Sequence, residues 1–199
     1  MRLYSFCEYA VNTGSVNVAK HSARGMANPI ELKPVSKQDG LLQVIIETPK
    51  GCCNKFAFDP EQKVFALKKV LPAGMVFPYD FGFLPKTLAP DGDPIDVLVL
   101  MDEPAFPGVI VRARLIGIIE GEQIEGKKKT RNDRLLAVAE TNFLYSTIRS
   151  HKDLPGKWMK QVEEFFVNYH RLEGKEYRLL GCRGVNEANR MIEQARRAA

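Results

Sequence analysis

Short strand-like segments fill the first two thirds of this sequence, and helical patterns follow only after them. The segments carry β-branched and apolar residues, continuously or in alternation, and are bounded by turn-forming residues. They cover residues 41–48, 55–58, 64–67, 96–101, 109–120 and 134–139. The stretch Asp59-Pro60-Glu61-Gln62 predicts a hairpin turn, and we expect the polar residues 120–133 to form a hairpin loop.

Two amphipathic helices are predicted near the C-terminus. The first carries apolar side chains at helical spacing, namely Trp158, Met159, Val162, Phe165, Phe166 and Tyr169. The second covers about residues 186–197, with an apolar face formed by Ala188, Met191, Ile192 and Ala195. Strands followed by helices predict a mainly β (α+β) fold, in which a closed β-barrel has both helices packed outside it.

The first 36 residues differ from the rest of the chain. They are rich in Asn, Ser, Gly and Pro and show no sustained periodicity, so we expect residues 1–36 to be a poorly ordered extension. Met26 is a second plausible start of translation. The remaining residues, 37–199, are the right length for one domain.

Composition excludes several classes of protein. No apolar run approaches the ~18 residues that span a bilayer, so no membrane partner is expected. The cysteines Cys7, Cys52, Cys53 and Cys182 form no C-x-x-C pair, which favours reduced thiols and a cytoplasmic location. The three histidines are scattered, so a bound metal would be held by oxygen ligands. A net charge of +5 permits an anionic partner.

The acidic stretch Asp91-Gly92-Asp93-Pro94-Ile95-Asp96 lies directly before a buried strand. Three carboxylates at such a position repel one another unless cations offset their charge. A short Asp-Gly-Asp stretch is usually a surface turn, but the apolar residues 97–101 argue against that interpretation. An EF-hand is also a poor fit, because Asp96 stands where that loop needs glycine and Asp102 where it needs glutamate. The stretch therefore indicates an oxygen-only site for a hard ion such as Mg²⁺.

Cationic residues elsewhere in the chain complete this pattern. Lys55, Lys68 and Lys69 lie on or beside the first hairpin, and Arg134 begins a later strand. Each alone is typical of a solvated surface charge. Together with metal ions they would neutralise a multiply charged anion such as pyrophosphate.

Four segments, in this order, resemble the soluble family I inorganic pyrophosphatases. They are Ile46-Glu47-Thr48-Pro49, the aromatic segment 77–83, the acidic stretch 91–96 with Val97-Leu98-Val99, and a helix with Phe165, Phe166 and Tyr169 followed by Leu172-Glu173-Gly174-Lys175. The resemblance covers about residues 40–185. It implies an OB-like five-stranded closed barrel, a magnesium-dependent hydrolysis of pyrophosphate to two phosphates, and a homo-oligomer.

The resemblance also implies roles for individual residues. Asp93 would be the catalytic base on a metal-activated water. Asp91 and Asp96 would bind magnesium, and Glu47 would orient the metal site from outside the direct ligands. The substrate phosphates would be held by Lys55, Lys69, Arg134 and Tyr169. Lys69 stands where the family has arginine, and Arg134 where it has lysine.

Several positions depart from the family pattern. A glutamate is replaced by Ala57, two tyrosines by Phe77 and Phe81, and a lysine by His170. These changes remove charge and hydroxyl groups but leave the three aspartates, so we expect an active enzyme with altered properties.

The most important departure is Asn132, which stands where the family has a metal-binding aspartate. A one-residue slip would bring Asp133 to this place, although its side chain would then face the other side of the strand. The preceding loop is longer than expected, so Glu122 or Glu125 would supply the other carboxylate, and we favour Glu125.

Two alternatives to the pyrophosphatase remain open. One is a catalytically weak relative that binds phosphate or a phosphorylated metabolite. The other is a nucleic-acid-binding OB module, which the basic charge balance would suit. Its candidate groove would contain Asp91, Asp93 and Asp96, which repel a phosphate backbone, so we expect no nucleic-acid partner.

Overall fold

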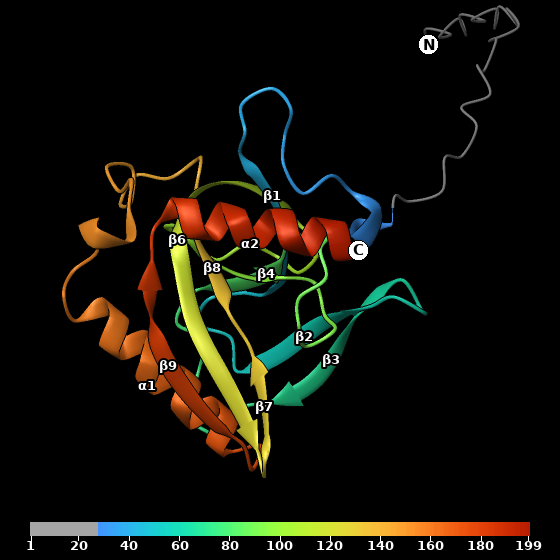
Figure 1. Cartoon of the computed structure of the whole chain (residues 1–199), viewed down its shortest axis with the longest axis vertical. Coiled ribbons are helices and arrows are strands. Elements are labelled where there is room, and N and C mark those ends of the chain that lie inside the picture. The colour runs from blue at the N-terminus through green and yellow to red at the C-terminus, as the bar shows by residue number, and fades with distance from the viewer. Residues whose placement is uncertain (1–27) are drawn as a thin grey trace, which may run out of the picture.

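The computed structural model describes residues 28–199, and its centre is a closed ring of five hydrogen-bonded strands (Figure 1). Each strand pairs with the next, and the last returns to the first. The order around the ring is β1 (Leu42–Thr48), β4 (Asp80–Phe83), β5 (Asp96–Leu100), β8 (Arg134–Ala139) and β6 (Ile110–Glu125). All pairs are antiparallel except β5 with β8. The predicted mainly β fold with a closed five-stranded arrangement is confirmed.

Strand β4 of the ring and strand β9 (Glu176–Arg183) outside it were not expected from the sequence. Strand β4 has only four residues, and β9 pairs along the outer part of β6. A Cβ atom on Gly82 in β4 would lie 2.1 Å from the Ile45 carbonyl oxygen, so only glycine allows β1 and β4 to approach this closely.

Residues 120–133 are a β-hairpin rather than the loop that the sequence predicted. Strand β6 continues to Glu125, and β7 (Lys128–Arg131) returns beside it. Unlike charges face each other across this ribbon, and the Lys129 ammonium lies 3.5 Å from the Glu122 carboxylate. A polar ribbon of this kind carries no buried face, which is why its strand character is weak in the sequence.

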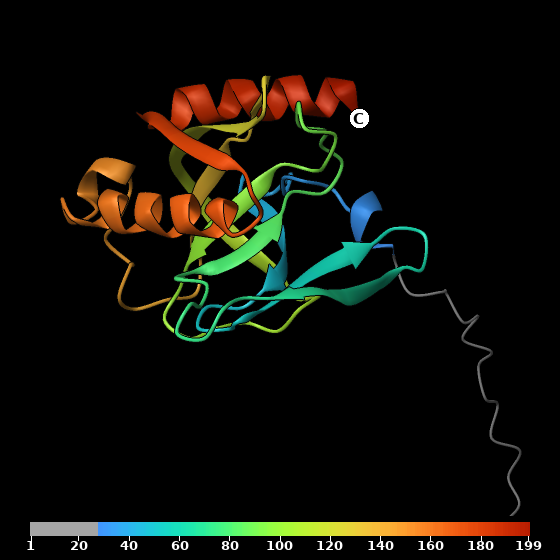
Figure 2. The same cartoon turned by 90° about the horizontal axis from the view of Figure 1, so that it is seen from below.

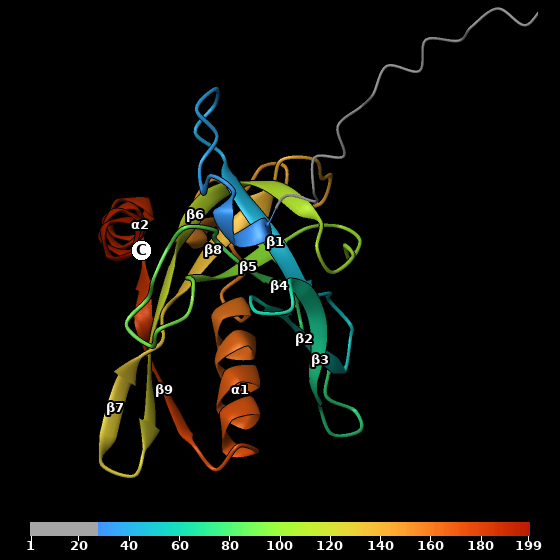
Figure 3. The same cartoon turned by 90° about the vertical axis from the view of Figure 1, so that its right-hand side faces the viewer.

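The other predicted hairpin is confirmed and forms a separate two-stranded sheet. Its strands are β2 (Asn54–Asp59) and β3 (Val64–Val70). Figure 3 shows this hairpin and the β6–β7 hairpin on either side of helix α1 (Trp158–Arg171).

Both predicted helices lie outside the strands, as Figure 2 shows. Alternate residues of β5 and β8 are buried on opposite faces, which explains their uninterrupted apolar sequences. Val97 and Leu135 pack in the cluster that includes α2 (Val185–Ala198), whereas Leu98 and Leu136 pack in the cluster that includes α1. The apolar face of α1 is therefore core, and Trp158 is only 6% exposed.

Residues 28–36, which the sequence analysis assigned to the extension, are attached to the domain. The 3₁₀ helix η1 (Pro29–Glu31) leads to a β-bridge between Val35 and Leu42, and the Lys86 amide donates to the Ile30 carbonyl over 3.2 Å. A second 3₁₀ helix, η2 (His151–Asp153), precedes α1. Cys7, Met26 and the predicted disorder of residues 1–27 lie outside the described residues. Within residues 28–199, no helix has the length and apolar character to cross a bilayer.

Candidate active site

A cavity of about 330 Å³ brings together most of the site residues that the sequence indicated. Residues from the β4–β5 loop, β2, the β6–β7 hairpin, β8 and α1 all contribute to it. The lining residues are Lys55, Phe77, Phe81, Asp91, Asp93, Asp96, Gln123, Asn132, Arg134, Phe166, Tyr169, His170, Glu173 and Lys175. The three aspartates thus share one pocket with cations that lie far away in the sequence.

A tight turn presents the aspartates to this pocket. The Gly92 amide donates to the Ala89 carbonyl over 3.0 Å, and the Ala89 amide donates to the Asp93 carbonyl over 2.8 Å. Gly92 has φ +96°, which favours glycine, and the Asp93 amide donates to Asp91 Oδ1 over 3.2 Å. Asp96 then begins β5, so the turn and the strand fix all three carboxylates on one wall.

Burial, reinforced by the neighbouring carboxylates, disfavours the charged forms of Asp96 and Asp91. Burial raises the pKa of Asp96 to about 6, and repulsion from Asp91 and Asp93 adds to this against the attraction of Arg134 and Lys55. Burial also raises the pKa of Asp91, with a further contribution from Asp93. Because cations stabilise ionised carboxylates, this wall favours a cationic ligand.

Arg134 is the cation that lies beside Asp96, and its own side chain is held in place by several contacts. It pairs with Asp96 across the parallel β5–β8 ladder, and its Nε lies 3.6 Å from Asp96 Oδ2. Its guanidinium stacks 3.9 Å above the Phe166 ring, and its Nη1 donates to the Tyr177 hydroxyl over 3.0 Å. With 3% exposure, Arg134 is a buried cation whose position is set before any anion binds.

Lys55 and Lys69 both approach the ring of Tyr169 from the β2–β3 hairpin. The Lys55 ammonium lies 5.6 Å from the ring centroid and the Lys69 ammonium lies 3.7 Å from it. Burial alone would lower the pKa of Lys55, but the neighbouring Tyr169 and Asp96 outweigh it and raise that pKa. Lys69 does not line the cavity but forms an ion pair with Glu173, which does. Lys68 instead pairs with Asp59, 3.6 Å away.

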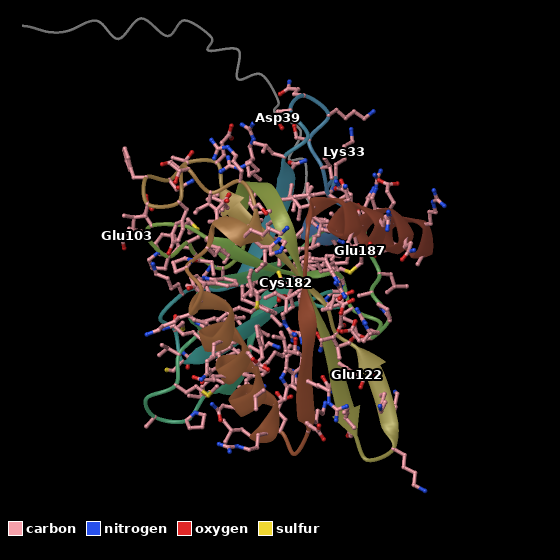
Figure 4. The ribbon with its side chains drawn as sticks, turned by 60° about the vertical axis from the view of Figure 1, so that its left-hand side comes forward. Lys33, Asp39, Glu103, Glu122, Cys182 and Glu187 are labelled. Atoms are coloured by element: carbon pink, nitrogen blue, oxygen red, sulfur yellow. The ribbon has the colours of Figure 1, made fainter. Side chains whose placement is uncertain are left out.

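Gln123 is the residue that the β6–β7 hairpin contributes to the pocket, and sequence reasoning missed it. Its Oε1 accepts a hydrogen bond of 3.3 Å from Asn132 Nδ2, while Asn132 Oδ1 is buried without a partner. Glu125 is 65% exposed and pairs with Lys175, and Glu122, which Figure 4 labels on β6, pairs with Lys129. Neither glutamate lines the pocket.

Asp133 faces away from the pocket. Its Oδ1 accepts from the Gly121 amide over 2.9 Å, and its Oδ2 lies 2.9 Å from Arg131 Nη2. It lines a different cavity beside α2. Asn132 therefore faces the site, and the one-residue slip that would bring Asp133 there does not occur.

Glu47 and His170 are buried residues at the edges of the site. Glu47 Oε1 accepts from the Phe58 amide over 2.8 Å, and burial raises the pKa of Glu47 to about 7. His170 stacks on Tyr177, and burial together with the charge of Arg134 lowers its pKa to about 4. A histidine at this place is thus neutral near pH 7, unlike a lysine. Lys175, also missed in the sequence, is a further cation of the pocket.

Comparisons with known proteins agree with this geometry. The family model "Inorganic pyrophosphatase" matches residues 44–199. An inorganic pyrophosphatase of Synechocystis sp. is 40% identical over 161 residues, covering 81% of this chain and 93% of that protein. One of Methanosarcina acetivorans is 38% identical, covering 77% and 89%.

A solved structure supports the same assignment. The crystal structure of the inorganic pyrophosphatase from Thermus thermophilus superposes with a TM-score of 0.79 at 30% identity, covering 86% of this chain and 98% of that one. The family model, the sequence identity and the fold lead to one conclusion: the chain belongs to the family I inorganic pyrophosphatases.

Proposed function

We propose that this chain is an inorganic diphosphatase that hydrolyses pyrophosphate to two phosphates with the help of Mg²⁺. The observation that carries the proposal is the shared pocket, in which Asp91, Asp93 and Asp96 face Lys55 and Arg134. In such an arrangement the carboxylates can bind metal ions that contact one side of a diphosphate. The fixed cations can form direct ion pairs with its other side. The names of the relatives point to the same activity.

The residues present fit magnesium. Among residues 28–199, no three acidic, histidine or cysteine side chains converge as a complete ligand set. Mg²⁺ does not need one, because it keeps several waters and commonly takes one or two carboxylates plus substrate phosphate oxygens. Asp91 and Asp96 would supply carboxylates, and the unpartnered, buried Asn132 Oδ1 would supply a neutral oxygen.

In the proposed mechanism, Asp93 accepts the proton of the attacking water. Bound Mg²⁺ would lower the pKa of that water and neutralise phosphate oxygens. Lys55, Arg134 and Tyr169 bind the phosphate oxygens and keep the leaving phosphate in line with the attack. Lys69 contacts the ring of Tyr169 and so supports this phosphate-binding side chain. Glu47 holds strand β2 in place by accepting the hydrogen bond from the Phe58 amide.

Release of phosphate from pyrophosphate tests the proposal directly. We expect turnover with Mg²⁺ and none in excess EDTA, with recovery when Mg²⁺ is restored. Full turnover in EDTA would show that the reaction does not depend on a divalent ion. No turnover at any Mg²⁺ concentration, with phosphate binding still measurable by calorimetry, would favour the second candidate below.

The second candidate is a weak relative that binds phosphate or a phosphorylated molecule. The hydrogen-bonded amides Gln123 and Asn132 favour it, because they place neutral oxygens beside the carboxylates. A nucleic-acid-binding module is not favoured, because the aspartates that line the pocket would repel a phosphate backbone. A gel shift with single-stranded DNA checks this.

We also propose that the chain is a homo-oligomer and acts in the cytoplasm as one domain, residues 37–199, with residues 28–36 attached. The exposed side chains of Phe143 and Leu144, 90% and 74% accessible, support the assembly. The α1 face contributes nothing to it, because it is buried within the subunit. Light scattering should give a dimer or larger particle; a monomer at working concentration contradicts the assembly.

A further inference from the structure

A second cavity, of about 180 Å³, adjoins the candidate active site. Lys55, Phe81, Asp93 and Asp96 line both cavities and therefore form their common boundary. The two cavities therefore lie side by side, on either side of these four side chains.

Beyond the boundary, the walls of the second cavity are mainly apolar. Phe58, Phe83, Ala57 and Ile30 contribute to them, together with Pro60 and Pro94. Among residues 28–199, Glu47 is the only additional charged side chain that lines it, and its Oε1 already accepts the hydrogen bond from the Phe58 amide. Inorganic pyrophosphate, which has no apolar part, would gain nothing from such walls.

These walls are fixed by the fold. Phe83 belongs to β4 and is 3% exposed, and Phe58 belongs to β2 and is 9% exposed. Their ring centroids lie 6.3 Å apart, and Phe65 supports Phe58 from behind at 5.3 Å. The cavity is therefore preformed, and a ligand would not have to move the core to enter it.

The size of the cavity indicates how large an occupant it accepts. A cavity of about 150 Å³ with apolar walls is large enough to bind benzene. The small side chain of Ala57 keeps the space open, because a longer side chain at this position of β2 would project into it.

We propose that the second cavity is a subsite for the apolar group of an organic diphosphate ester, with a group about the size of a benzyl ring or a five-carbon chain. The two phosphates bind in the first cavity, as in the proposed function on which this inference rests. The ester oxygen lies at the boundary beside Lys55 and Phe81, and the apolar group lies against Ala57, Phe58 and Phe83.

Two hydrolysis-resistant probes test this subsite by calorimetry in the presence of Mg²⁺. They are the monobenzyl and monomethyl esters of methylenebisphosphonic acid, whose P–C–P bridge resists hydrolysis. We expect the benzyl ester to bind about tenfold more tightly or better, because its ring leaves water for an apolar cavity. Equal affinities, or failure of both esters to bind a chain that turns over pyrophosphate, would overturn the inference.

Matched variants locate the effect. Ala57→Leu should fill the cavity and abolish the benzyl preference, while binding of the methyl ester reports that the variant is folded. Ala66→Leu is the control, because Ala66 pairs with Ala57 across the hairpin and does not line the cavity, and it should keep the preference. A preference that survives Ala57→Leu places the ring elsewhere and overturns the subsite. A benzyl preference without any pyrophosphate turnover would refute the proposed function and leave the subsite standing.

Discussion

Asn132 donates a hydrogen bond of 3.3 Å from its side-chain Nδ2 to Oε1 of Gln123, and both residues line the pocket of the three aspartates. Neither amide carries charge. The two amides therefore add oxygen atoms to the pocket without adding negative charge, so its attraction for a divalent cation is weaker than an aspartate at position 132 would make it.

Asn132→Asp should accordingly strengthen magnesium binding. Adding one negative charge a few ångströms from the ion should lower the Mg²⁺ concentration for half-maximal activity by roughly tenfold, which is about 1.4 kcal/mol. Calorimetric titration of Mg²⁺ without substrate should shift in the same direction. An unchanged titration would mean that this side chain does not contact the metal.

Asp133→Asn is the control for that prediction. Asp133 binds Arg131 and the Gly121 amide outside the pocket, so its loss should reduce stability and leave the magnesium titration unchanged. A large change in magnesium binding would instead show that Asp133 serves as the ligand in solution.

Asp93→Asn should lower turnover by about 10²–10⁴-fold, the usual effect of removing a general base. Asp96→Asn should weaken magnesium binding more than Asp93→Asn does, because Asp96 is a proposed ligand. Single-turnover rates at saturating Mg²⁺ and calorimetry separate the two effects. Near-normal turnover of the Asp93 variant would assign the proton to another group.

Gly121→Ala should disturb the support of Arg134. A Cβ atom on Gly121 would lie 2.0 Å from the Tyr177 hydroxyl, which accepts the hydrogen bond from Arg134. Overpacking should reduce the free energy of unfolding by about 1–3 kcal/mol and weaken pyrophosphate binding. Gly156→Ala is the matched control, because a Cβ there meets no neighbouring atom. Urea titrations of both variants check the prediction, and equal effects would contradict it.

His170 should make the protein less stable in mild acid. Its pKa is about 4 in the folded protein against about 6.5 in the unfolded chain, so between these values the unfolded chain binds more protons. The stability that neutral His170 contributes is present above pH 6.5 and is lost as the pH falls through 4. Between pH 7 and pH 5 the loss should be roughly 2 kcal/mol.

His170→Asn tests this, because an amide can still donate to the Phe166 carbonyl that His170 contacts at 2.8 Å. The variant should lose less stability between pH 7 and pH 5 than the original chain in urea unfolding. Parallel losses in the two proteins would show that other groups cause the acid sensitivity.

Features that depend on local patterns could be predicted from the sequence. The strands 96–101 and 134–139 could be predicted because both of their faces are apolar, and the two helices because their apolar residues recur every three or four positions. The acidic turn at Asp91–Asp96 was recognisable because its carboxylates and its glycine lie within a few residues of one another.

Which distant side chains share the pocket depends on how the strands pair in the folded chain. Arg134 lies beside Asp96 because β5 and β8 pair in parallel, which no local pattern specifies. Gln123 lines the pocket, whereas Glu125, two residues further along the same face of β6, lies exposed at the end of the β6–β7 hairpin. Alternation along a strand tells which residues share a face, but how far along that face the site lies depends on strand pairing across the whole fold, so the local sequence does not distinguish Gln123 from Glu125.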